Sequence, residues 1–223
     1  MHIIDLAVEA GRTILSEYES KQVLASYHIP VTREIVVDNV EDLMKAARDI
    51  GYPLVLKACS PEIAHKTEKG LIRVDIRNNQ EAAEAFEQIT LSMGSAQGTV
   101  LVQEMVKGAR ELVAGLTRDP QFGPCVMFGL GGIFTEVLND VVFRIAPLSK
   151  RDALEMMQEI KSHKILGAVR GMEAADLDML SEMLINVGRI GLEQEKIKEI
   201  DINPVILRGS KPVAVDALMV LKA

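Results

Sequence analysis

The chain has 223 residues, of which 48% are hydrophobic and 26% charged, and its formal net charge is −7. This length can bury a substantial core, either in one domain or in two small lobes. The acidic balance disfavours nucleic acid as a partner, and no apolar run approaches the ~20 residues that cross a bilayer. The beginning of the sequence lacks the pattern of a secretory signal, and Cys59 and Cys125 have neither disulfide nor metal-ligand spacing. We therefore expect a cytoplasmic protein with two buried cysteines and no membrane or nucleic-acid partner.

Helices and strands alternate in the first hundred residues. Two capping boxes, at residues 16–19 and 38–41, open helices that end near Pro30 and Gly51. Runs of β-branched and apolar residues between the helices predict strands. The expected elements are a helix over 16–30, a strand over 32–37, a helix over 38–50, strands over 53–57 and 71–76, and a helix over 79–93.

The rest of the chain is richer in closely spaced strands, which indicates an antiparallel sheet. The expected elements are strands over 99–103, 111–116, 125–128 and 141–145, helices over 150–160 and 174–191, and strands over 197–202, 205–207 and 213–218. The change of texture predicts an α/β (α+β) fold with two lobes. We expect a small lobe over residues 22–102 and a large lobe built from residues 1–21 and 103–223.

Lys57 ends a short apolar strand, Pro53 to Lys57. A lysine at such a position can neutralise phosphate oxygens, because a buried ammonium without an anion is costly. The plainer interpretation is a lysine whose side chain extends from the strand end to water.

The segment from Gln103 to Glu111 ends one strand, bends and begins another. A connection of this kind between lobes can offer backbone groups to an adenine ring, while Glu104 or Glu111 accepts hydrogen bonds from ribose hydroxyls or lies on the cation side. Lys107, in the same segment, is a further candidate for nucleotide binding. A charged hairpin is an equally good interpretation of the segment taken alone.

Asp201 and Asn203 alternate along a predicted strand, so their side chains share one face, and Asp216 lies on the next strand. A hairpin pairing can place Asp216 beside Asn203. Such oxygen donors suit magnesium, which takes one or two protein oxygens in addition to phosphate and water. The alternative is a turn before Pro204 with Asp216 on a solvated face.

Two further segments are weaker signals. The glycine-rich stretch from Gly129 to Gly132 lets backbone N–H groups approach an anion, with Arg144 as an inward-facing cation, but it also fits a plain hairpin turn. His65 lies in a polar loop over residues 60–70, where a neutral imidazole can accept or transfer a proton or phosphoryl group. A lone histidine in a loop is more often solvated surface.

Taken together, these segments resemble one family in order and spacing. The segments are Pro53–Lys57, the loop from Ser60-Pro61 to His65-Lys66, Val102–Glu104, Arg110–Leu112, Gly129–Phe134 and Asp201–Pro204. The chain is similar over nearly its whole length to the ATP-grasp β subunit of ADP-forming acetyl-CoA (acyl-CoA) synthetase, a relative of succinyl-CoA synthetase β. The resemblance implies an ATP-grasp fold, with ATP or ADP and Mg²⁺ in the cleft between two lobes.

The resemblance also implies a reaction and a partner. Acyl-CoA, ADP and phosphate give a carboxylate, CoA and ATP, with the phosphoryl group carried on histidine. The partner is an α subunit that carries the CoA-binding domain and the first phosphohistidine, in an α2β2 assembly.

Each candidate residue receives a role from the family. Lys57, Glu104, Lys107 and Glu111 bind the nucleotide, Asn203 and Asp216 bind magnesium, Asp201 orients the incoming phosphohistidine, and His65 relays the phosphoryl group to ADP.

One departure from the family concerns the His65 loop, where Gly70 is followed by Leu71 rather than by a second glycine. Two alternatives to the subunit interpretation remain open on the sequence. A self-contained ATP-grasp carboxylate ligase shares Lys57, Asn203 and Asp216 but does not need His65, and a nucleotide-sensing module binds ATP without transferring phosphate.

Overall fold

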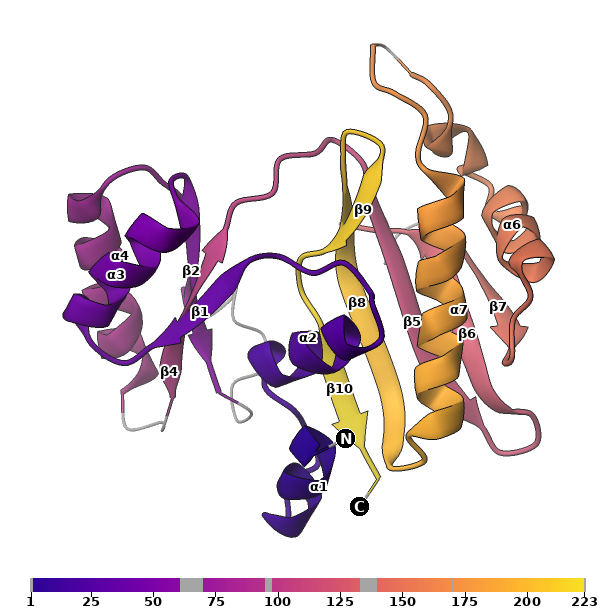
Figure 1. The fold of residues 1–223 in the computed structure, drawn as a ribbon, viewed down its shortest axis with the longest axis horizontal. Coiled ribbons are helices and arrows are strands. Elements are labelled where there is room, and N and C mark those ends of the chain that lie inside the picture. The colour runs from indigo at the N-terminus through magenta and orange to yellow at the C-terminus, as the bar shows by residue number, and fades with distance from the viewer. Residues whose placement is uncertain (1, 61–69, 95–97, 133–139, 170, 223) are drawn as a thin grey trace. The chain divides into compact units, whose positions relative to one another are not determined.

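The structure is a computed structural model that describes residues 2–60, 70–94, 98–132, 140–169 and 171–222 (Figure 1). The chain divides into two compact units. The larger unit contains residues 1–15, 19–31 and 107–223, and the smaller unit contains residues 16–18 and 32–106. Among the helices in the described part of the chain, none combines the length and hydropathy that a bilayer span requires.

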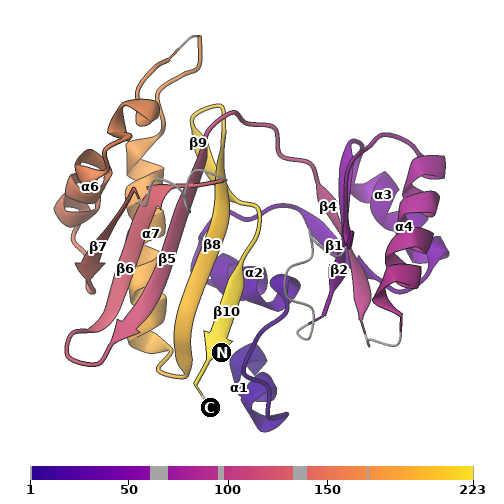
Figure 2. The ribbon, with the colours of Figure 1, turned by 180° about the vertical axis from the view of Figure 1, so that it is seen from behind.

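The smaller unit is built on a four-stranded antiparallel sheet with the order β1-β4-β2-β3. Its elements are β1 (Glu34–Val37), α3 (Val40–Ile50), β2 (Leu54–Cys59), β3 (Ile72–Ile76), α4 (Asn79–Met93) and β4 (Thr99–Glu104). Helices α3 and α4 lie side by side against one face of this sheet (Figure 2). The core between these two layers contains Leu54, Leu56 and Ala58 of β2, which alternate along the strand.

Both helices of the smaller unit begin at asparagine caps. The side chain of Asn39 accepts a hydrogen bond from the N–H of Asp42, and Asn78 caps α4 in the same way. The expected capping residue Asp38 is therefore off by one position, because the Asn39 amide oxygen satisfies the orphan donor instead. Helix α3 ends at Gly51, whose φ of 87° suits glycine.

The larger unit is built on a six-stranded antiparallel sheet with the order β10-β8-β5-β6-β7, in which β9 also pairs with β8. Its strands are β5 (Glu111–Asp119), β6 (Gly123–Leu130), β7 (Val141–Ile145), β8 (Ile197–Arg208), β9 (Lys211–Ala214) and β10 (Leu218–Leu221). Its helical elements are α1 (His2–Glu9), most of α2 (Glu17–Ser26), α6 (Lys150–Glu159), the short 3₁₀ helix η1 (His163–Leu166) and α7 (Leu177–Glu193).

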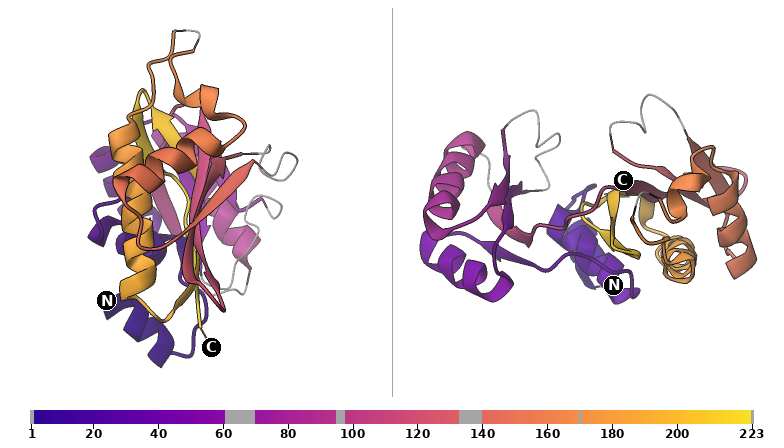
Figure 3. Two further views of the ribbon diagram at one scale, coloured as in Figure 1. Left: turned by 90° about the vertical axis from the view of Figure 1, so that its right-hand side faces the viewer. Right: turned by 90° about the horizontal axis from the view of Figure 1, so that it is seen from above.

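The long helix α7 packs on β5 and β6, on the same side of the sheet as α2 (Figure 3). Residues Ile200 and Ile202 of β8 point into this core and are at most 2% exposed. Asp201, which lies between them in sequence, therefore points to the other face, which α2 and α7 do not cover, and so do Glu199 and Asn203. This alternation decides where the polar side chains of β8 lie.

The final strands differ from the sequence-based expectation. β8 is one strand that continues through Pro204, where two shorter strands were expected. The expected strand over 213–218 is instead two short strands, β9 and β10, that both pair with β8. Pro204 lies where the register between β8 and β5 shifts, between the pairs Ala114–Ile202 and Leu112–Val205, and a proline is tolerated at such an irregularity. Its carbonyl accepts from the N–H of Val215 at 3.0 Å.

The division into units also differs from the expected lobe boundaries, which were 22–102 for the small lobe and 1–21 with 103–223 for the large lobe. Residues 19–31 group with the larger unit because Val23, Leu24 and Ile29 pack into its core.

Of the two cysteines, Cys59 is buried as expected, and Cys125 is partly exposed because it lies on β6, near the strand's start at the turn from β5. Neither cysteine forms a disulfide.

Candidate functional site

Three polar residues of β8 share the uncovered face of the larger sheet. Glu199, Asp201 and Asn203 alternate along the strand and line a pocket of about 270 Å³. Met127 of β6 and Phe143 of β7 contribute apolar walls to the same pocket. The pairing of Asp201 and Asn203 on one face, expected from the period of two, is what the structure shows.

Asp216 lies in the short break between β9 and β10. Val205 pairs with Ala214 before the break and Asp201 pairs with Leu218 after it, in one continuous register. This register places Asp216 opposite Asn203, although the segment between the strands makes no regular ladder. The sequence predicted this juxtaposition from a hairpin, and the geometry arises from two short strands on the same edge of β8.

The backbone next to Asp216 is held by a buried lysine. The ammonium of Lys21, on α2, donates to the carbonyl of Val215 at 3.1 Å, and the Lys21 side chain is fully buried. The N–H of Val215 donates in turn to the carbonyl of Pro204. The residue that precedes Asp216 is therefore fixed on both sides, which limits the positions that the Asp216 side chain can take.

The carboxylates of this face repel one another. The pKa of Asp201 is raised to about 6, first by burial of the carboxyl and then by the nearby charges of Asp216 and Glu199. A divalent cation would offset that repulsion, and carboxylate and amide oxygens are the hard donors that Mg²⁺ prefers. No cluster of three or more His, Cys, Asp or Glu suited to a metal occurs among the described residues. The donor set thus fits a cation that takes few protein ligands.

The raised pKa of Asp201 should make the free energy of unfolding depend on pH. An aspartate in an unfolded chain titrates near ~3.9. Between that pH and about 6 the folded chain keeps a proton that the unfolded chain releases, so the free energy of unfolding falls as the pH rises. Without metal or nucleotide, Asp201→Asn should be more stable than the wild type by about 1–2 kcal/mol at pH 7 and equal to it below about pH 4.

Urea unfolding over this pH range measures the effect, with the exposed Glu195→Gln as the matched control. If the wild type were more stable than Asp201→Asn at pH 7, this result would contradict the assigned environment of Asp201.

Lys57 lies in the smaller unit, on the face of β2 that points away from α3 and α4. Its ammonium is 2.7 Å from a carboxylate oxygen of Glu17, the first residue of α2. The two side chains are 5% and 1% exposed. The lysine is therefore buried within the sheet rather than extended to water, and its charge is balanced inside the protein.

The remaining nucleotide candidates have different surroundings. The carboxylate of Glu104 accepts a hydrogen bond at 3.0 Å from the backbone N–H of Arg33 in the smaller unit. Lys107 is exposed. Glu111 begins β5, and its backbone carbonyl accepts from the N–H of Gly131. The first contact orients the carboxylate of Glu104, and the last fixes the backbone of Glu111.

Close packing explains the glycines after β6. A Cβ on Gly131 would lie 2.5 Å from the carbonyl oxygen of Leu112, and one on Gly132 would lie 2.5 Å from a carboxylate oxygen of Glu111. Gly132 also has a φ of +69°. The expected inward-facing Arg144 instead pairs with Glu159 of α6. His65 lies outside the described residues.

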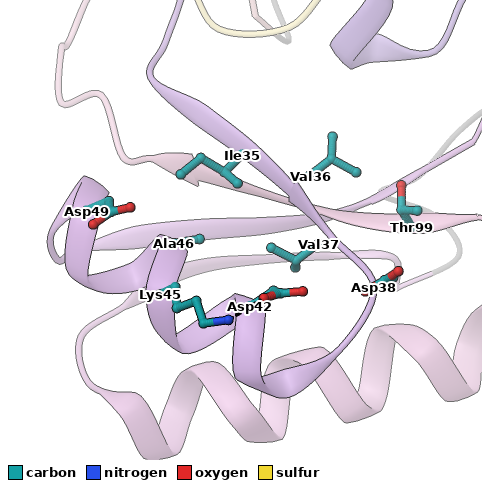
Figure 4. Close-up of a pocket in the computed structure, with 9 residues that line it drawn as sticks. All are labelled: Ile35, Val36, Val37, Asp38, Asp42, Lys45, Ala46, Asp49 and Thr99. Carbon is teal, nitrogen blue, oxygen red and sulfur yellow. Dashed lines mark hydrogen bonds and ion pairs between the residues drawn. The ribbon is translucent and has the colours of Figure 1, made fainter.

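A separate pocket lies in the smaller unit between β1 and α3 (Figure 4). Its volume is about 330 Å³, and it contains Asp38, Asp42, Lys45 and Asp49 but no predicted site residue. The ammonium of Lys45 lies 2.9 Å from Asp42 and 3.0 Å from Glu41, so its charge is neutralised by exposed carboxylates of α3. Nothing in this geometry points to catalysis.

A sequence model described as the ATP-grasp domain matches residues 6–221. The chain belongs to the ATP-grasp family. This ATP-grasp chain is 43% identical over 224 aligned residues to the acetate–CoA ligase [ADP-forming] I subunit beta of Pyrococcus furiosus, covering 98% of this chain and 96% of that protein. Within the family it therefore groups with the β subunits of ADP-forming acetate–CoA ligases, and both the predicted resemblance and the predicted fold class are confirmed.

Two solved structures of the dinucleotide forming acetyl-coenzyme A synthetase 1 of Ca. Korarchaeum cryptofilum share this ATP-grasp architecture. One, in complex with coenzyme A, Ca-AMPCP and HgCl⁺, has a TM-score of 0.95 and 42% identity over 99% of both chains. The other, with coenzyme A and Mg-AMPPCP, is described as having its phosphohistidine segment pointing towards the nucleotide binding site. Its TM-score is 0.89, with 43% identity over 99% of both chains.

Sequence reasoning missed three residues of the ATP-grasp chain that the structure places close to predicted site residues. Glu199 could have been found by extending the β8 alternation one step backwards from Asp201. Glu17 and Lys21 gave no such signal, because their partners Lys57 and Val215 lie 40 and 194 positions away in sequence.

Proposed function

We propose that the chain is the nucleotide-binding β subunit of an ADP-forming acyl-CoA (acetyl-CoA) synthetase. The assembled enzyme converts acyl-CoA, ADP and phosphate into a carboxylate, CoA and ATP. The observation that carries the proposal is the match, at 43% identity and over almost the full length of both chains, to a β subunit of such a ligase. The position of Asp216 opposite Asn203 in the register of β8, which suits a metal–nucleotide, supports it.

The proposed reaction has three steps. Phosphate attacks the thioester, forms an acyl phosphate and releases CoA. A histidine of the partner then takes the phosphoryl group and releases the carboxylate. Finally the phosphoryl group passes, through His65, to the terminal phosphate of ADP, and both histidines return to their free form.

The two units are proposed to be the small and large lobes of the ATP-grasp fold, and residues of both are proposed to bind the nucleotide. Lys57 of the smaller unit binds nucleotide phosphates as a positive point charge. Glu104, Lys107 and Glu111, where the chain passes from the smaller unit to the larger, bind the rest of the nucleotide.

Asn203 and Asp216 are the proposed magnesium ligands. The cation supplies positive charge that offsets the phosphates and the local carboxylates. Asp201 lies in the pocket near the charges of Asp216 and Glu199. Its carboxylate accepts a hydrogen bond from the incoming phosphohistidine and orients it. A protonated imidazole formed as the phosphoryl group leaves is stabilised by this carboxylate.

The partner is proposed to be an α subunit that carries the CoA-binding domain and the first phosphohistidine, in an α2β2 heterotetramer in the cytoplasm. One observation supports a separate partner: the similar Pyrococcus protein is named a subunit.

ATP formation from acetyl-CoA, ADP and phosphate tests the proposal. The chain mixed with its α partner should form ATP, and neither protein should do so alone. If the chain alone joined a carboxylate to an amine with ATP, the alternative of a self-contained ATP-grasp ligase would replace the subunit proposal.

Asp216→Ala should weaken the affinity for Mg·ADP by about 10- to 100-fold, because a charged metal ligand opposite Asn203 is lost. Calorimetric titration with and without Mg²⁺ measures this. Asp178→Ala, at an exposed position on α7, is the control and should bind as the wild type does. An unchanged affinity in Asp216→Ala would exclude Asp216 as a ligand.

A further inference from the structure

The ion pair between Glu17 and Lys57 is buried on both sides. The 2.7 Å separation is that of a charge-assisted hydrogen bond, and the side chains are 1% and 5% exposed. Removing two charges from water is costly, and an ion pair of this kind is often replaceable by apolar side chains without loss of stability. Stability alone therefore does not explain why the charges of Glu17 and Lys57 are buried here.

The geometry of the pair suggests a different use. A lysine side chain has a flexible four-carbon stem, so the position of its ammonium must be fixed by something else. Lys57 extends from a fully buried β2 strand that pairs with both β3 and β4, which fixes its backbone. Glu17 supplies a carboxylate at the first residue of α2, where the helix dipole favours negative charge. Both ends of the contact are thus held by secondary structure.

An ammonium has three N–H donors and can bond to more than one acceptor at the same time. The negative charge of Glu17 also favours the charged form of Lys57 in a buried site, which is the form that attracts a phosphate. We propose that Glu17 is a positioning residue for the nucleotide phosphates: its carboxylate fixes the direction of the Lys57 ammonium. This inference rests on the proposed role of Lys57 in nucleotide binding.

The chain offers a matched control two residues further along the same helix. Glu19 accepts two hydrogen bonds from Arg12, at 2.7 and 2.8 Å, and these side chains are 25% and 29% exposed. Glu19→Gln therefore removes a carboxylate from the same helix, but the ion pair that it breaks is with Arg12 and not with Lys57.

Glu17→Gln keeps the size and an acceptor oxygen but removes the charge. In the assembled enzyme it should raise the KM for ADP and weaken Mg·AMPPCP binding by about 10- to 100-fold, with a smaller change in kcat. Glu17→Asp should recover part of the loss, and Glu19→Gln should stay within about twofold of the wild type. Calorimetry and steady-state kinetics measure these values after circular dichroism has checked each fold.

A double-mutant cycle separates positioning from a general structural effect. In a Lys57→Met background, Glu17→Gln should cause no further loss of nucleotide affinity, because the ammonium that it positions is gone. Wild-type affinity and KM in Glu17→Gln, with Lys57→Met impaired, would overturn the positioning role alone. Wild-type affinity in Lys57→Met would overturn the proposed function of Lys57 instead. A further loss in the double variant equal to that in Glu17→Gln would assign Glu17 a role independent of Lys57 and overturn the inference.

Discussion

Lys57→Met should reduce the affinity for Mg·ADP by about 100-fold or more and reduce ATP formation at least as much. The reason is the loss of a buried positive charge that the phosphates need, in a site where water cannot replace it. Isothermal titration of the chain with Mg·ADP, and turnover of the complex with the α partner, measure the two effects.

Stability must be separated from binding in this variant. Removing Lys57 leaves Glu17 buried beside an apolar side chain, and the loss of one partner of a buried ion pair costs about 3–5 kcal/mol. The double variant Lys57→Met/Glu17→Gln removes the uncompensated charge and should regain most of that stability without regaining nucleotide affinity. Recovery of both together would show that Lys57 serves the fold only.

The largest effect on turnover should come from His65→Ala. Nucleotide affinity should stay within about twofold of the wild type, while ATP formation by the assembled enzyme falls by at least about a thousandfold. The physical reason is that an imidazole nitrogen is the proposed carrier of the phosphoryl group, and alanine offers no nucleophile. Incubation of the wild type with labelled ATP and Mg²⁺ should leave an acid-labile, base-stable label that the variant lacks.

His163→Ala is the matched control, because His163 is an exposed histidine of η1 in the larger unit. Its turnover should equal that of the wild type. Full turnover in His65→Ala would show that the partner's phosphohistidine delivers directly to ADP.

The strands and helices were largely predictable because each carries a local pattern. The expected strand over 141–145 and the helix over 79–93 have the bounds that the structure gives to β7 and α4. Alternation along β8 likewise predicted that Asp201 and Asn203 share a face. These features depend on neighbouring residues alone, which the sequence displays directly.

Pairing between distant segments was harder to predict. A proline usually interrupts a strand, so residues 197–208 were divided at Pro204, although its carbonyl still accepts a hydrogen bond from Val215. The partner of Lys57 could not be read from the sequence, because many acidic residues could serve and only tertiary structure selects Glu17. The same holds for Lys21, whose ammonium donates to the backbone carbonyl of Val215, 194 positions away in sequence.

The central claim is that Lys57 and the pair formed by Asn203 and Asp216 bind the same nucleotide. A crystal structure of the chain with Mg·AMPPCP tests it most directly. We expect the Lys57 ammonium at about 3 Å from a phosphate oxygen, with side-chain oxygens of Asn203 and Asp216 at about 2.1 Å from the magnesium ion. A nucleotide bound elsewhere, for example in the pocket between β1 and α3, with Lys57 and the Asn203–Asp216 pair both out of contact with it, would contradict this assignment.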